Sequence, residues 1–148
     1  MTVPQQADAD PVEVVLDWLR GDPEVLDLLG GPEHLSGIPE APWPHLVVGD
    51  GTAGDLRDFR WDAELEVTLN LYGAPDGAPG ASAIRRLLYR IAARAAALAD
   101  EQAVEVTTPV VSRVKPSGRD IAQALSNGQP LLSLGVLVTI RPPLQLAP

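Results

Sequence analysis

The sequence predicts an α+β fold in which an antiparallel-rich, four-stranded sheet packs against two main helices. Residues 62–72 alternate apolar and polar side chains without a break, which is typical of a strand with one face in a core. Residues 11–29 and 81–100 instead carry apolar side chains at helical spacing. The predicted order is therefore helix, strand, strand, helix, strand, strand.

The N-terminal helical region contains two helix start signals. Asp10-Pro11 is the first, and Asp22-Pro23 follows Gly21 as the second. We therefore expect a long helix and then a short one that ends at Gly30-Gly31. The second main helix, residues 81–100, should bury one side, formed by Ile84, Leu87, Leu88, Ile91, Ala92, Ala95 and Leu98.

Residues 62–72 form the predicted central strand. Its core side consists of Ala63, Leu65, Val67, Leu69 and Leu71. A shift of one residue would turn this whole set toward solvent, so the register should be strongly specified. Glu64 and Glu66 lie on the outward side, which fits an exposed sheet face or a subunit surface that must be negative.

The other strands are shorter or less regular. Residues 45–48 predict a short strand that ends at the glycine-rich residues 49–51, and residues 131–141 predict the last strand. Residues 104–106 and 110–115 predict strand interrupted by Pro109. Residues 121–125 predict a single helical turn.

The length of 148 residues fits one domain. We assign residues 11–141 to it, with a flexible N-terminus over 1–10 and a C-terminal tail over 142–148. Residues 50–61 are polar and turn-rich and too long for a tight hairpin, which predicts a projecting loop or arm.

Composition excludes several classes of function. The chain has no cysteine, so disulfides, thiolate catalysis and cysteine-based zinc sites are excluded. The net charge of −9 disfavours sequence-specific DNA binding. The first thirty residues lack a basic start followed by an apolar run, so we expect no signal peptide, and no apolar stretch is long enough to span a membrane.

No pattern of residues indicates catalysis. His34 and His45 have no neighbouring ligand at metal-binding spacing, and we expect ordinary surface or half-buried imidazoles. Glu64 and Glu66 form a carboxylate pair on one strand face, but no nucleophile or oxyanion donor accompanies them. We expect a protein that is not an enzyme and has no cofactor.

The second main helix carries the clearest candidate for an interface. Arg86, Arg90 and Arg94 recur every four residues and predict a basic stripe, with small Ala93 and Ala97 beside it. The simpler interpretation is a solvated face whose later arginines complement the helix C-terminus. The arm offers a second candidate interface, formed by Leu56, Phe59 and Trp61.

The order and spacing of the elements resemble those of the tail terminator, or tail-completion, proteins of long-tailed, siphovirus-like bacteriophages. The resemblance includes an amphipathic helix ending in Asp-Pro-x-Val-Leu-x-Leu-Leu-Gly (residues 22–30) and the sequence Pro-His-Leu-Val-Val-Gly (residues 44–49). A long alternating strand ending in Tyr72-Gly73, a helix and two closing strands follow. The proline-rich 31–44 loop is longer than in the family pattern.

The resemblance implies a structural virion protein, located in the tail and neck and assembled in the cytoplasm of the bacterial host. Its members form a ring, usually a homohexamer, at the head-proximal end of the tail tube. The implied partners are the major tail tube protein and a neck, or head–tail connector, protein, and DNA passes through without sequence-specific binding. The alternatives are another head–tail connector such as the stopper, or a non-viral monomeric ligand-binding or regulatory domain.

Overall fold

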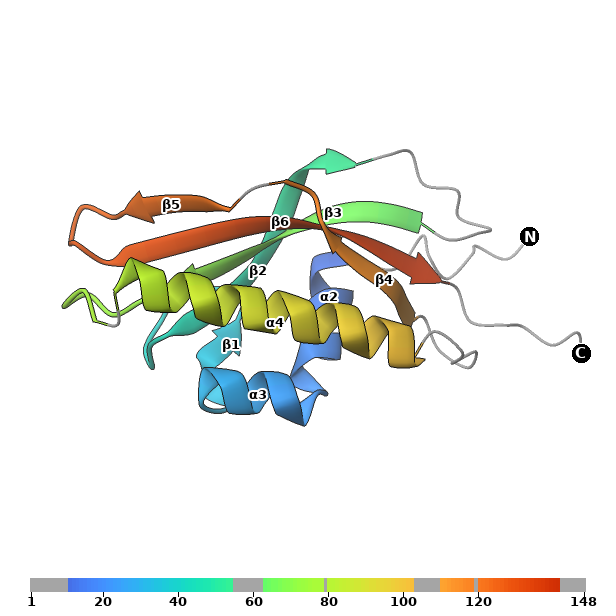
Figure 1. Cartoon of the computed structure of the whole chain (residues 1–148), viewed down its shortest axis with the longest axis horizontal. Helices are drawn as coiled ribbons and strands as arrows, with labels where there is room; N and C mark the ends of the chain where they lie inside the picture. The colour runs from blue at the N-terminus through green and yellow to red at the C-terminus, as the bar shows by residue number, and fades with distance from the viewer. Residues whose placement is uncertain (1–10, 55–62, 79, 103–109, 119, 142–148) are drawn as a thin grey trace, which may run out of the picture.

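The computed structural model describes residues 11–54, 63–78, 80–102, 110–118 and 120–141. Within these ranges three α-helices lie on one side of a six-stranded sheet, and the longest of them, α4, runs along it (Figure 1). The predicted α+β class is confirmed. The sheet has two strands more than the predicted four, because the short β1 pairs with β2 and the short β5 pairs with β6.

The helices follow the predicted boundaries closely. Helices α2 (Pro11–Arg20) and α3 (Pro23–Leu29) precede the 3-10 turn η1 (Pro32–His34), and α4 spans Ala81–Gln102. Asp22 caps α3, since its Oδ2 accepts from the Val25 N–H at 3.2 Å. Gly30 ends α3 with φ at 109°, a conformation that glycine adopts at little cost. None of the described helices is long and apolar enough to cross a membrane.

The sheet has the order β1-β2-β3-β6-β4, with β5 also paired to β6. All neighbours are antiparallel except β1 and β2, which are parallel. The last strand in the chain therefore lies between β3 on one side and both β4 and β5 on the other. The bounds are Leu35–Ser36 for β1, His45–Gly54 for β2, Ala63–Tyr72 for β3, Val110–Pro116 for β4, Ile121–Ala124 for β5 and Pro130–Arg141 for β6.

Two local predictions are wrong. Residues 121–124 form strand β5 rather than a helical turn, because their backbone pairs with residues 130–133 of β6. Strand β2 continues to Gly54, so residues 50–54 belong to the sheet instead of a projecting arm. The remainder of the predicted arm, residues 55–62, lies outside the described residues, as does the predicted strand over 104–106.

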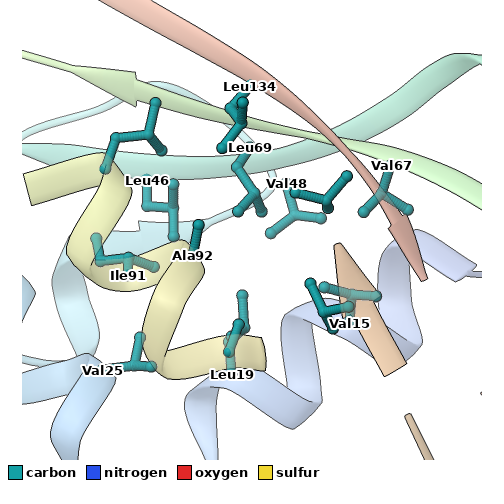
Figure 2. Packing of buried hydrophobic residues seen from close by; sticks show 14 of the residues in the cluster. Val15, Leu19, Val25, Leu46, Val48, Val67, Leu69, Ile91, Ala92 and Leu134 are labelled. Atoms are coloured by element: carbon teal, nitrogen blue, oxygen red, sulfur yellow. The ribbon is translucent and has the colours of Figure 1, made fainter. Parts of the chain in front are cut away.

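The core lies between the sheet and the three helices (Figure 2). Val67, Leu69 and Leu71 of β3 are opposite Val136, Leu134 and Leu132 of β6, and all six are buried. Helix α4 covers them with its apolar side, and α2 contributes Val15 and Leu19. The alternation along β3 therefore turns Val67, Leu69 and Leu71 toward the core, as the sequence predicts.

The other side of the sheet carries no described helix (Figure 1). We call it the outward sheet face, and its members in the three central strands are mostly half-buried. A polar pair links two of these strands, because Ser133 Oγ donates to Asn70 Oδ1 at 2.7 Å. The face consists of His45, Val47, Gly49, Glu66, Thr68, Asn70, Tyr72, Leu131, Ser133, Gly135, Leu137 and Thr139.

Candidate functional site

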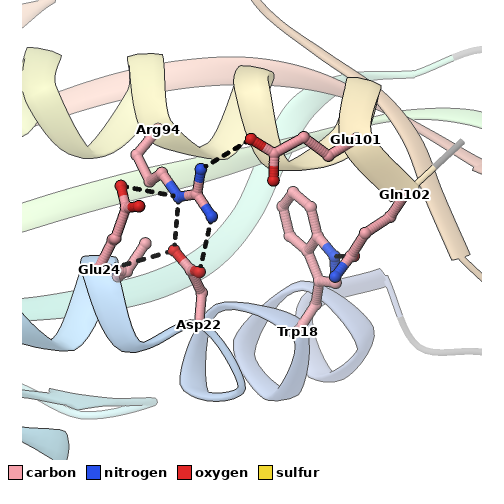
Figure 3. Close-up of polar contacts among 7 residues, drawn as sticks. Trp18, Asp22, Glu24, Arg94, Glu101 and Gln102 are labelled. Atoms are coloured by element: carbon pink, nitrogen blue, oxygen red, sulfur yellow. Dashed lines mark hydrogen bonds and ion pairs between the residues drawn. The ribbon is translucent and has the colours of Figure 1, made fainter.

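Arg94 is the centre of a cluster of charged side chains where α4 meets α3 (Figure 3). Its Nε and Nη2 donate to the two carboxylate oxygens of Asp22 at 2.9 and 3.0 Å. Its Nε also lies 3.3 Å from Glu24 Oε2, and its Nη1 donates to Glu101 Oε1 at 3.1 Å. A planar guanidinium that meets a carboxylate through two parallel bonds fixes the angle between the two helices.

The cluster shifts the pKa values of both Asp22 and Arg94. The hydrogen bond from Arg94 lowers the pKa of Asp22, and this outweighs the burial of the carboxylate, which alone would raise it. The hydrogen bond from Asp22 likewise raises the pKa of Arg94. The Asp22 carboxylate therefore stays charged although its side chain is only 4% exposed.

Acid should weaken this cluster. Because the folded-state pKa of Asp22 lies below 3.8, its contribution to stability is present above that pH and is lost as the pH falls through the lowered value. We expect Asp22→Asn, which keeps an oxygen to cap α3, to lose less stability than the wild type between pH 5 and pH 2. Urea unfolding curves at several pH values measure this, and parallel losses in both proteins would contradict it.

This geometry removes Arg94 from the predicted basic stripe of Arg86, Arg90 and Arg94. Arg94 points sideways toward α3 and is neutralised there by carboxylates, so it does not belong to an exposed face. Arg86 and Arg90 are exposed, and within the described part of the chain neither has an ion-pair partner. They border a shallow depression of about 170 Å³ with Ala83 and Leu87. The last turn of α4 contains no basic residue, so these arginines do not complement its C-terminus.

A second polar contact ties α4 to the start of β5. Arg85 Nε donates to Asp120 Oδ2 at 2.9 Å, and the Tyr89 hydroxyl donates to the other oxygen of the same carboxylate. Hydrogen bonds from Tyr89 and then Arg85 lower the pKa of Asp120. Asp120 thus occupies one flank of α4, while Asp22 occupies the other.

His45 is fully buried, contrary to the expected half-buried or surface imidazole. Its Nε2 lies 2.7 Å from Ser36 Oγ, and burial lowers its pKa. A serine beside a histidine can be a nucleophile and its base, but here Ser36 Oγ donates to the Ile38 carbonyl at 2.8 Å. Among the described residues, no carboxylate hydrogen-bonds to His45 Nδ1 as in a catalytic triad, and the ring is instead contacted edge-on by Trp43 at a centroid distance of 6.3 Å. The pair anchors the 37–44 loop and has no catalytic arrangement.

A depression larger than the one beside Arg86 and Arg90 lies between α2 and β4. It has a volume of about 370 Å³ and is lined by Val14, Asp17, Trp18 and Val111. The Trp18 indole donates to Gln102 Oε1 at 2.7 Å, which holds α2 against the end of α4 (Figure 3). One rim carboxylate over an apolar floor offers no set of converging polar groups for a reaction.

The remaining predicted site residues are only partly placed. Leu56, Phe59 and Trp61 lie outside the described residues. Glu64 is in β3, opposite Thr139 of β6, and Glu66 is half-buried on the outward sheet face opposite Leu137. Among the described residues, no three histidine, aspartate or glutamate side chains form a group that could hold a metal ion.

Comparisons with known proteins identify no family for this chain. No protein-family model matches it, and no curated protein matches it significantly.

Proposed function

We propose that the chain is a tail terminator, a structural protein that forms a ring at the head-proximal end of a phage tail tube. The observation that carries the proposal is the two-layer arrangement, in which all the described helices lie on one side of the sheet. It leaves two different surfaces, the outward sheet face and the outer side of α4. A subunit in a closed ring contacts its two neighbours through two different surfaces of this kind.

The composition of the outward sheet face supports a protein contact. Tyr72 and Leu137 are half-buried there and keep some apolar area that a neighbour could cover. Polar side chains alternate with them along β3 and β6, as in a protein interface that combines apolar area with hydrogen-bonding groups. Glu64 and Glu66 belong to the same strand and would place carboxylates at the joint or at the lumen.

The charge of the chain also fits a ring through which DNA moves. A net charge of −9 repels phosphates, so a lumen lined by such subunits would not retain DNA. On this proposal the protein needs neither a cofactor nor a catalytic group. Its partners would be further copies of itself, the tail tube protein and a neck protein.

Electron microscopy of purified tail tubes mixed with the protein tests the proposal. We expect a ring at one end of each tube, and tubes capped in this way should not grow when fresh tube protein is added. Binding along the tube wall, or no binding, would overturn the proposal. Binding to filled heads but not to tubes would instead assign the protein to the neck as a connector.

A variant of the outward sheet face makes this experiment specific for that surface. Leu137→Arg adds a charge to that face, and the residue is half-buried there without belonging to the core cluster. We expect it to abolish capping while leaving the fold intact by circular dichroism. Asp76→Arg, in the exposed turn before α4, is the matched control and should cap tubes normally.

A further inference from the structure

Between Arg86 and Asp100, five exposed residues form one line along α4, which we call the α4 stripe. At about 100° per residue they lie within about 80° of the helix circumference, opposite the side that packs on the sheet. Arg94 and Arg85 lie on the two flanks, where they meet Asp22 and Asp120. The stripe is therefore the outermost line of the helix and consists of Arg86, Arg90, Ala93, Ala97 and Asp100.

The order of charges along the α4 stripe is the reverse of the order that stabilises a helix. Helices are stabilised by acidic residues near the N-terminus and basic residues near the C-terminus. Here Arg86 and Arg90 lie in the N-terminal half, and Asp100 lies near the C-terminal end. Within the described residues, neither Arg86 nor Asp100 has an ion-pair partner. Helix stability does not account for this arrangement.

The spacing makes the α4 stripe complementary to itself. Arg86, Ala93 and Asp100 are separated by two equal steps of seven residues, so Ala93 is the midpoint between a cation and an anion. If two copies of α4 pack antiparallel with a two-fold axis beside Ala93, Arg86 of each copy faces Asp100 of the other. The same operation places Arg90 beside Ala97 of the other copy.

Small side chains at the centre allow this packing. Ala93 and Ala97 are exposed and have no side chain beyond Cβ, so another helix can approach closely along them. The two ion pairs would be about 21 Å apart, since fourteen residues separate Arg86 from Asp100. Antiparallel helix dipoles also attract one another weakly.

We propose that the free protein dimerises through the α4 stripe, with α4 of one copy antiparallel to α4 of a second copy. A second copy of the chain is the favoured partner, because the stripe contains both the cation, Arg86, and the anion, Asp100, that each ion pair needs. This extends the proposed function, since a ring joint that uses the outer side of α4 excludes the dimer. Dissociation would then be required before subunits join a ring.

A single cysteine tests the two-fold geometry, because the chain has none of its own. In Ala93→Cys the two thiols would face each other across the axis, and mild oxidation should yield a disulfide-linked dimer. Ala78→Cys, exposed in the turn before α4, is the matched control and should remain monomeric on denaturing gels. Equal cross-linking of the two variants would overturn the proposal.

Charge reversal tests the pairing of Arg86 with Asp100. We expect Arg86→Glu and Asp100→Arg each to weaken dimerisation at least about tenfold in sedimentation velocity experiments. The double variant should dimerise as the wild type does, since it exchanges the two charges. A double variant as weak as the single ones, or a wild type that stays monomeric up to about 0.5 mM, would overturn the proposal. Arg113→Glu, an exposed change on β4, should have no effect.

The disulfide also separates this inference from the proposed function. Oxidised Ala93→Cys should fail to cap tubes and should regain capping after reduction. Capping by the oxidised dimer would show that α4 is not part of the ring joint, while the dimer itself would stand on the cross-linking result. A protein that dimerises but never caps tubes would overturn the tail terminator proposal alone.

Discussion

Arg94→Met should lower the free energy of unfolding by about 3 kcal/mol, because it leaves the Asp22 carboxylate buried without its cation. Asp22 is 4% exposed, so water cannot replace the two hydrogen bonds from the guanidinium. Methionine keeps most of the length of the side chain, which limits any loss of packing. Chemical denaturation at neutral pH measures the change.

Arg90→Met is the matched control, because Arg90 lies one turn earlier on the same helix and is exposed. In dilute protein it should change stability by less than about 0.5 kcal/mol. The loss in Arg94→Met should also shrink at low pH, where Asp22 becomes protonated. Equal losses in the two variants would mean that the Arg94 cluster does not stabilise the fold.

Leu69→Ala should destabilise the domain by about 3–4 kcal/mol. Leu69 is 1% exposed in the middle of β3, between Val48 of β2 and Leu134 of β6 (Figure 2). Truncation removes apolar contacts on both sides, and the sheet cannot close the cavity without shifting a register set by all its neighbours. Thermal or urea unfolding gives the change directly.

Thr68→Ala is the control on the opposite side of the same strand. Thr68 lies on the outward sheet face and donates only one exposed hydrogen bond, to the Asp50 carbonyl at 3.1 Å. Its loss should amount to no more than about 1 kcal/mol. A loss in Thr68→Ala as large as that in Leu69→Ala would mean that the outward sheet face is part of the core.

The parts of the fold that the sequence predicts well are those with a long, regular period. Strand β3 and helix α4 each carry enough alternation or helical spacing to define both their type and their buried side. Strand β5 has only four residues, all exposed, and it is a strand solely because β6 lies beside it. The extension of β2 over Asp50–Gly54 likewise depends on β3, across a shift in register.

The polar contacts are harder to predict from the sequence, because each joins segments that are far apart in the chain. The spacing of Arg86, Arg90 and Arg94 correctly indicates neighbouring positions on a helix. It cannot show that α3 brings Asp22 to one of the three, since 72 residues separate Asp22 from Arg94. The Asp-Pro start signal identified Asp22 as a helix cap, and its second role as an ion-pair partner had no local signal.

The position of β6 has a consequence for how the chain folds as it leaves the ribosome. Strands β1 to β3 and helix α4 are all synthesised before β6. In the finished sheet, however, β6 lies between β3 on one side and β4 and β5 on the other. Until it emerges, one backbone edge of β3 has no partner, and the apolar side of α4 has only part of its sheet. The nascent domain must therefore complete its sheet late, through pairs between strands distant in sequence, a topology associated with slow folding.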